Sequence, residues 1–350
     1  MIKRSFIIIS LAFMSIMTGS TQTIMHRIAI GSNLDQEGSQ RIIDLIARRK
    51  PDAFISLGNI ITGGSANQVE MREKYGTLSE WQGLKKLKES TKFFATWDDH
   101  EYGESEGGKH FSDKGAYKQL FLDFAGDPDN SLRKSHEGVY NAYGYGNAGS
   151  RVSIILLDTR TFRDNLLPYQ GDRRDDPRFF HPLQYSPYKS ADSTLLGEDQ
   201  WIWLERQLME PALVHLIVSP IPFSAEYNGM ESWANFPHEQ NRLFKLLDKT
   251  RALGVVFLSS HAGYSEISKL KRDGYYPIYD YTCAGLNTQK YFATANANRI
   301  EGPIMEPNFG LLTFDWAPGK VTMTMECIDA NNNSRFEYIV KLTHLWPDSE

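Results

Sequence analysis

The chain has 350 residues, of which 41% are hydrophobic and 23% are charged, so it is long and apolar enough to bury a sizeable core. This composition excludes a disordered or fibrous protein. The formal net charge is −5, and no long basic run with interleaved aromatic residues occurs, so the electrostatic signature of a nucleic-acid-binding protein is missing.

The N-terminus has the pattern of a secretory signal peptide. Lys3 and Arg4 precede an apolar run that is shorter than the roughly 20 residues of a membrane-spanning helix. Small residues follow the run, so we expect cleavage after Ser20. The prediction is an exported protein, periplasmic or extracellular, with a signal peptide over 1–20, one domain over 21–350 and no membrane span after cleavage.

Apolar runs then alternate with amphipathic stretches, which predicts an α/β protein. The predicted strands are 27–31, 53–57, 93–96, 152–158, 213–219 and 255–259, and the predicted helices are 39–49, 68–89, 113–124, 197–208 and 239–252. Three further strands, over 310–316, 320–327 and 335–343, are joined by turns and favour an antiparallel sheet at the end of the fold. We predict one domain of two packed sheets flanked by helices.

Two features between these elements leave alternatives. The stretch over 164–192 is long, rich in Pro, Tyr, Arg and Asp, and has no clear period. Because long irregular loops in compact domains are usually functional or disordered, we interpret it as a lid or rim over a site. The two cysteines, Cys283 and Cys327, form a disulfide in an oxidising compartment or serve as buried small hydrophobic residues.

Polar residues follow five of the predicted strands, where ligands gather in open α/β sheets. These residues are Ser32-Asn33, Gly58-Asn59, Asp98-Asp99-His100, Asp158-Thr159-Arg160 and Ser260-His261. A binuclear hydrolase needs such carboxylates and imidazoles, because two cations about 3.5–4 Å apart must generate hydroxide and neutralise phosphoryl charge. Asp98 and Asp99 supply hard oxygen ligands, and His100 either binds metal or protonates the leaving oxygen. Arg160 and Arg163 offer forked donors that match phosphate oxygens.

The segment from Phe94 to Gly103, Phe-Ala-Thr-Trp-Asp-Asp-His-Glu-Tyr-Gly, resembles the corresponding loop of alkaline phosphatase D, the PhoD-like phosphatases. Further blocks in the family's order are Leu57-Gly58-Asn59-Ile60, Leu157-Asp158-Thr159-Arg160, Leu196-Gly197 with Gln200-Trp201, Glu231-Ser232-Trp233, Val256 to Ser259 with Glu266, and Asn308-Phe309-Gly310. The resemblance implies a four-layer αββα sandwich of the metallophosphoesterase (calcineurin-like) type. It also implies hydrolysis of a phosphate ester at an iron–calcium centre.

The chain departs from the family pattern where metal should bind. The family's first strand ends in a cysteine ligand, and here Asn33 stands there. The second block should carry a bridging aspartate and a tyrosine, which are replaced by Asn59 and Thr62. In the last block an aspartate and a histidine become His261 and Gly263. Since cations held by fewer anionic ligands bind less tightly, we expect the iron–calcium centre to be lost.

Three functions follow from these observations. In the first, the protein is a pseudoenzyme that keeps the fold and a cleft for a phosphate ester or other small ligand. In the second, it is a hydrolase with a reorganised metal site, in which Asp99 and His100 are catalytic and a divalent cation, calcium or another, is bound. The metal ligands in that case are drawn from Asp98, Asp99, His261, Asn59 and Asn33. In the third, it is a carbohydrate- or partner-binding module with a rim of Tyr169, Tyr185, Tyr188 and Trp233.

Each candidate residue also has a structural explanation. Asn33 and Asn59 are ordinary turn formers at strand ends. His261 is either a ligand or a semi-buried histidine with satisfied hydrogen bonds. Arg160 and Arg163 either bind phosphate or form a structural ion pair after a buried strand.

Overall fold

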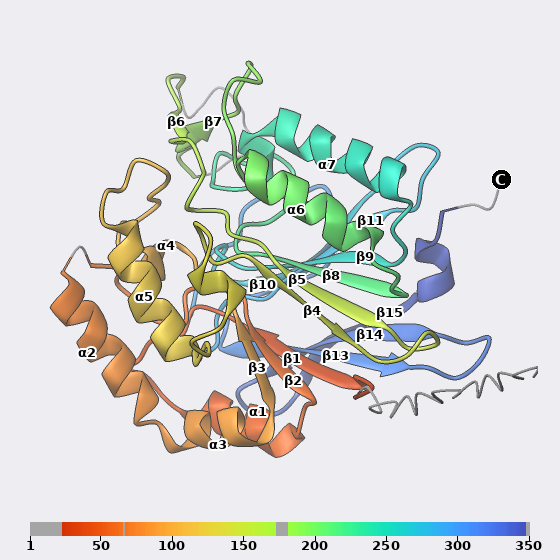
Figure 1. The fold of residues 1–350 in the computed structure, drawn as a ribbon, viewed down its shortest axis with the longest axis horizontal. Coiled ribbons are helices and arrows are strands. Elements are labelled where there is room, and N and C mark those ends of the chain that lie inside the picture. The colour runs from red at the N-terminus through yellow and green to blue at the C-terminus, as the bar shows by residue number, and fades with distance from the viewer. Residues whose placement is uncertain (1–22, 66, 173–180, 348–350) are drawn as a thin grey trace, which may run out of the picture.

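The computed structural model describes residues 23–65, 67–172 and 181–347. Two β-sheets lie face to face, and helices cover both outer faces (Figure 1). This arrangement confirms the predicted four-layer αββα sandwich. The predicted signal peptide, 1–20, lies outside the described residues.

The first sheet contains six strands in the order β15-β14-β13-β1-β2-β3. Their bounds are β1 Arg27–Gly31, β2 Ala53–Ser56, β3 Lys92–Ala95, β13 Asn308–Asp315, β14 Thr322–Asp329 and β15 Ser334–Lys341. The three N-terminal strands are parallel, and β13 pairs antiparallel with β1. The predicted antiparallel strands at the end of the chain therefore extend the N-terminal sheet.

The second sheet contains seven strands in the order β12-β10-β11-β9-β8-β5-β4. Their bounds are β4 Asn141–Tyr145, β5 Val152–Leu156, β8 Val214–Ser219, β9 Val255–Ser259, β10 Ser265–Leu270, β11 Ile278–Thr282 and β12 Arg299–Ile304. Three of these, β5, β8 and β9, are the predicted apolar runs, and all their residues are buried or nearly so. The edge strands were not predicted, because glycine and polar residues interrupt their alternation.

Helices α1, α2, α3 and α5 lie on the side of the first sheet, and α6 and α7 cover the second (Figure 1). Their bounds are α1 Arg41–Arg49, α2 Gln68–Ser79, α3 Gln82–Ser90, α5 Lys114–Ala125, α6 Glu198–Met209 and α7 Pro237–Thr250. The prediction of one helix over 68–89 is wrong, because the chain is extended at Trp81, with φ −64° and ψ 119°. The Trp81 indole is 4% exposed, and α3 runs in a different direction from α2 (Figure 1).

Apolar side chains fill the space between the sheets and the space beneath each helical layer. Under α6 and α7, the rings of Phe223 and Phe257 stack with centroids 4.0 Å apart, and Trp233 packs edge-on against Phe223. Burying one such side chain is worth about 1.5–3 kcal/mol. This core fixes the strand ends, which carry the polar residues of the site.

Several smaller predictions can be compared with the structure. Both cysteines are free thiols, and both are buried. Within 164–192, the described residues form a short antiparallel pair of β6, Leu167–Pro168, and β7, Tyr185–Ser186. Residues 173–180 of the predicted lid lie outside the described residues. In the described part of the chain, no helix has the length and apolarity that a bilayer crossing requires.

Candidate functional site

The carboxyl ends of strands from both sheets meet at one cavity of about 330 Å³. Five of the predicted site residues line it, namely Asn33, Asn59, Asp99, His100 and His261. Glu106, Glu231 and Lys290 line it as well. The other predicted residues, Asp98, Arg160 and Arg163, lie fully buried beneath it.

Asn59 stands at a sharp turn after β2. Gly58 precedes it with φ +104°, and a Cβ atom there would lie 2.7 Å from the Asp98 Cβ, so only glycine fits. The Asn59 side-chain oxygen accepts from the backbone N–H of His100 at 3.2 Å. Its Nδ2 donates to Asp98 and to Asp99, both at 3.1 Å. The amide therefore presents hydrogen-bond donors, not an anionic oxygen, to both carboxylates.

Glu101 connects this turn to the loop after β3. The sequence did not mark Glu101 as a site residue, although it lies inside the Phe94–Gly103 segment. Its carboxylate accepts from the backbone N–H groups of Asp98 and Asn59, both at 2.9 Å, and from that of Ile60. The loop forms the short helix α4, Asp99–Tyr102, and these bonds fix its first turn against the β2 turn.

Both carboxylate oxygens of Asp98 are occupied by cations of the chain. Oδ1 accepts from Arg160 Nε at 2.7 Å and also from Arg160 Nη2. Oδ2 accepts from His261 Nδ1 at 2.8 Å, besides the Asn59 amide. Burial by itself raises the pKa of Asp98, but the charges of Arg160 and His261 outweigh it and hold the pKa below its usual range.

Arg160 also pairs with Glu231, which comes from the loop after β8. Its two terminal nitrogens each donate to a separate Glu231 oxygen at 3.0 Å, a bidentate contact. Arg163 Nε lies 3.1 Å from the same carboxylate, and all three side chains are 0% exposed. This placement agrees with the structural ion pair that the sequence left as an alternative to phosphate binding.

His261 completes the network from the turn after β9. Its Nε2 lies 3.4 Å from Glu231 Oε2, and its Nδ1 lies 3.9 Å from Asp99 Oδ1. Burial alone lowers the pKa of His261, but the surrounding carboxylates, Asp98 above all, raise it to about 9. The imidazole therefore carries a positive charge at neutral pH.

Two groups of described side chains have the spacing of a metal site. Asp98, Asp99 and His261 form one, and Glu106, Glu231 and His261 form the other, with ligand atoms within 4.8 Å of one another in each. Neither group includes His100, whose Nδ1 lies 3.1 Å from the Ile61 carbonyl oxygen.

Four residues around the cavity adopt left-handed backbone conformations although they are not glycine. They are Asn33, Asn59, Glu106 and His261, with φ between 49° and 66°. Such conformations cost roughly 1–2 kcal/mol per residue and cluster at functional sites. The clustering marks this cavity as the candidate site.

The aromatic rim predicted from the sequence loses one of its four members, and the three tyrosines are partly exposed. Trp233 is 0% exposed and lies in the core beneath α6 and α7, so its predicted place on the rim is wrong. The Tyr188 ring stacks on Phe236, and its hydroxyl donates to the Asn165 carbonyl. Phe292, which is 42% exposed, is an aromatic residue that lines the cavity.

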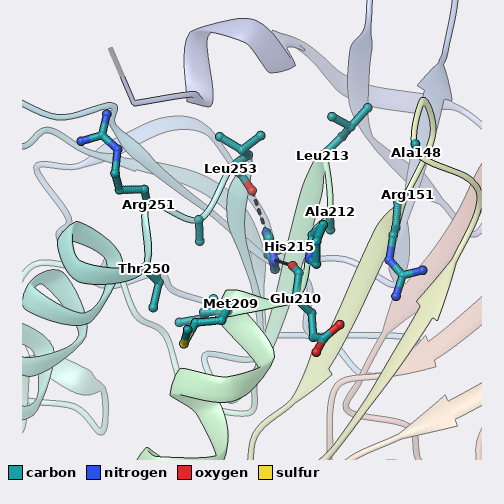
Figure 2. Close-up of a pocket in the computed structure, with 13 residues that line it drawn as sticks. Ala148, Arg151, Met209, Glu210, Ala212, Leu213, His215, Thr250, Arg251 and Leu253 are labelled. Atoms are coloured by element: carbon teal, nitrogen blue, oxygen red, sulfur yellow. Dashed lines mark hydrogen bonds between the residues drawn. The ribbon is translucent and has the colours of Figure 1, made fainter. Parts of the chain in front are cut away.

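A second cavity, of about 560 Å³, lies at the opposite, amino edge of the seven-stranded sheet. It opens between the ends of α6 and α7. Figure 2 shows His215, near the start of β8, with its two ring nitrogens directed at backbone carbonyls of Leu253 and Glu210. Neither group with metal-site spacing among the described residues lies there.

The sandwich, with acidic and imidazole side chains at the strand ends, defines a protein of the metallophosphoesterase type. The PhoD-like phosphatase family matches residues 65–285, and the chain belongs to this family. That match confirms the resemblance seen in the sequence. It begins after Asn33 and Asn59, two of the replaced positions.

Two solved structures share the fold. The structure of PhoD superposes with a TM-score of 0.60 at 16% identity, covering 91% of this chain and 72% of that chain. GAP50, the anchor in the inner membrane complex of Plasmodium, superposes with a TM-score of 0.56 at 15% identity, covering 91% of this chain and 89% of its own. No curated protein matches the sequence.

Proposed function

We propose that this protein is an exported, PhoD-like binding protein for a phosphate ester or similar small ligand, with hydrolysis impaired or absent. One observation carries the proposal: both oxygens of Asp98 are already bonded to Arg160 and His261. Two charges of the chain thus stand beside the carboxylate that a metal cation would need.

The iron–calcium centre of the family does not fit this donor set. Asn59 directs an NH₂ group at Asp98 and Asp99, and the bond from the His100 N–H to its oxygen holds that orientation. A cation needs an oxygen lone pair at this point, so the amide offers the opposite polarity. Two-metal hydrolysis needs two cations, which generate the attacking hydroxide and are held by a shared anionic ligand. Arg160 and His261 supply positive charge, but they do not generate hydroxide as metal ions do.

The test is metal analysis of the purified protein combined with hydrolysis of bis(4-nitrophenyl) phosphate. We expect less than one tightly held metal per chain and no turnover beyond that of Asp99→Ala. Tightly held metal, together with turnover that Asp99→Ala abolishes, would overturn the proposal.

A second candidate is a hydrolase with one divalent metal, which the group of Glu106, Glu231 and His261 supports. His261 Nδ1 is bonded to a carboxylate, as the outer nitrogen of a metal-bound histidine usually is. If calcium, manganese or zinc added to the metal-free protein restores turnover, and Glu106→Gln prevents it, this candidate replaces the first.

Export and a non-catalytic role are parts of the same proposal. The predicted signal peptide supports export, which N-terminal sequencing of protein recovered from the periplasm or medium tests by a mature chain starting near Thr21. GAP50, which is described as an anchor, has the same fold. This likeness supports a role for the fold other than hydrolysis. A carbohydrate- or partner-binding module stays an alternative, favoured by glycan binding that survives His100→Ala.

A further inference from the structure

The loop between β11 and β12 forms one wall of the site cavity. Lys290, Phe292 and Thr294 line the cavity from this loop. Tyr291 and Phe292 are 84% and 42% exposed, although aromatic side chains of this size are usually buried. The loop therefore offers one cation, Lys290, and one accessible ring, Phe292, to the cavity.

Lys290 lies across the position at which the resemblance to the PhoD-like family implies a histidine ligand. That position is Gly263, with φ +76°, and a Cβ atom there would lie 2.4 Å from Lys290 Cε and 2.9 Å from Lys290 Cγ. The lysine stem thus fills the space in which the side chain of the lost ligand would begin. The ammonium group at the end of this stem brings a positive charge close to Gly263, where the expected histidine ligand is absent.

The Lys290 ammonium is available for an anion. It lies 5.9 Å from the Phe292 ring centroid, and within the described ranges it forms no ion pair. Two carboxylates that line the cavity already have cationic partners. Glu231 is paired with Arg160, and Glu266 is paired with Arg299. Among the described cations of this cavity, Lys290 is therefore the one whose charge is not spent on a carboxylate.

The wall is held in place by hydrogen bonds to its backbone and side chains. The Lys290 N–H donates to the Met305 carbonyl at 3.0 Å. Thr294 Oγ1 accepts from Asn228 Nδ2 at 2.8 Å and lies 2.7 Å from the Tyr264 hydroxyl. A wall fixed in this way loses little conformational entropy when a ligand binds.

We infer that Lys290 and Phe292 form a subsite for a phosphodiester monoanion with an aromatic or apolar substituent. The inference rests on the proposed function, because it names the ligand class of the same cavity. A single ammonium balances a single negative charge, whereas Asp99 and Glu106 in this cavity repel the second charge of a phosphomonoester. The Phe292 ring then packs against the substituent.

Calorimetric titration of the full chain with diphenyl phosphate at pH 8 tests the subsite, with phenyl phosphate as the dianionic comparison. We expect Lys290→Gln to weaken diphenyl phosphate binding by about tenfold, and Phe292→Leu by about threefold. The matched control is Lys320→Gln, an exposed lysine in the turn between β13 and β14, which should bind like the wild type. Added salt should weaken wild-type binding more than binding by Lys290→Gln.

Gly263→Ala gives a second test that leaves Lys290 in the chain, since the new methyl group must displace its stem. Weaker binding in both variants, with thermal unfolding showing folded protein, supports the subsite. Unchanged affinity of Lys290→Gln, or tighter binding of phenyl phosphate than of diphenyl phosphate, overturns it and leaves the proposed function standing. A wild-type protein that binds neither ester overturns both.

Discussion

The two edges of the seven-stranded sheet each hold a histidine with little exposed surface, 16% for the His261 side chain and 1% for His215, and the two histidines differ in charge. At the carboxyl edge, Asp98 and its neighbours raise the pKa of His261 to about 9. At the amino edge, burial lowers the pKa of His215, whose ring nitrogens lie 2.8 and 3.3 Å from the Leu253 and Glu210 carbonyl oxygens. Neighbouring full charges, not burial alone, decide whether a buried imidazole is protonated.

The comparison also separates cavity size from chemistry. The amino-edge cavity is larger, about 560 Å³ against about 330 Å³. Its histidine meets only carbonyl dipoles, and Met209 beside it is 65% exposed. Carboxylates, arginines and left-handed turns gather at the smaller cavity because the strand ends of both sheets meet there. The charged side chains of the two sites are thus concentrated at the carboxyl edge.

Removing the central cation of the carboxyl edge should have the largest effect. Arg160→Met leaves Asp98 and Glu231 buried with one partner fewer each, and we expect a loss of about 3–5 kcal/mol in the free energy of unfolding. Urea denaturation measures it. Lys85→Met removes the exposed ion pair with Glu80, whose side chains are 40% and 79% exposed, and should cost less than about 1 kcal/mol. Equal effects of the two substitutions would contradict the expectation that burial makes the loss of an ion-pair partner more costly.

The pH dependence of stability should follow the charge of His261. Because its folded pKa of about 9 exceeds the ordinary 6.5, its stabilising contribution is complete below pH 6.5 and is lost as the pH rises through 9. The difference in unfolding free energy between wild type and His261→Gln should fall by up to about 3 kcal/mol over this window. Urea denaturation at pH 6, 7.5 and 9.5 checks this, and a constant difference would mean a neutral imidazole.

The sequence predicts the sheets of this fold better than its charge network. Continuous runs such as Val214–Ser219 identify strands buried on both faces, and the polar residues after them mark the site edge. Arg160 and Asp98, which are hydrogen-bonded, lie 62 residues apart in the sequence, and Arg160 and Glu231 lie 71 residues apart. Such pairings depend on how loops from different strands meet. Lys290 lies in a loop without a period, so no pattern marks it.

Restoring the family's carboxylate should destabilise the carboxyl edge unless a metal enters. Asn59→Asp replaces a donor with a third negative charge against Asp98 and Asp99, and we expect a loss of about 2 kcal/mol in metal-free buffer. Calcium or manganese should recover part of this loss in the variant and leave the wild type unchanged. Unfolding temperatures with metal and with chelator measure both effects. Equal metal stabilisation of the two proteins would mean that the wild type already holds the cation.

His215 should show the smallest effect and the opposite dependence on pH. Its folded pKa is lowered, so the unfolded chain binds a proton more readily, and its contribution to stability is lost as the pH falls below 6.5. His215→Gln should cost about 1 kcal/mol at pH 7.5, the value of one hydrogen bond to a carbonyl. The difference from wild type should shrink at pH 5, where urea denaturation can still be measured. If instead the difference shrinks towards pH 9.5, His215 is charged in the folded protein, and carbonyl dipoles alone suffice to protonate a buried imidazole.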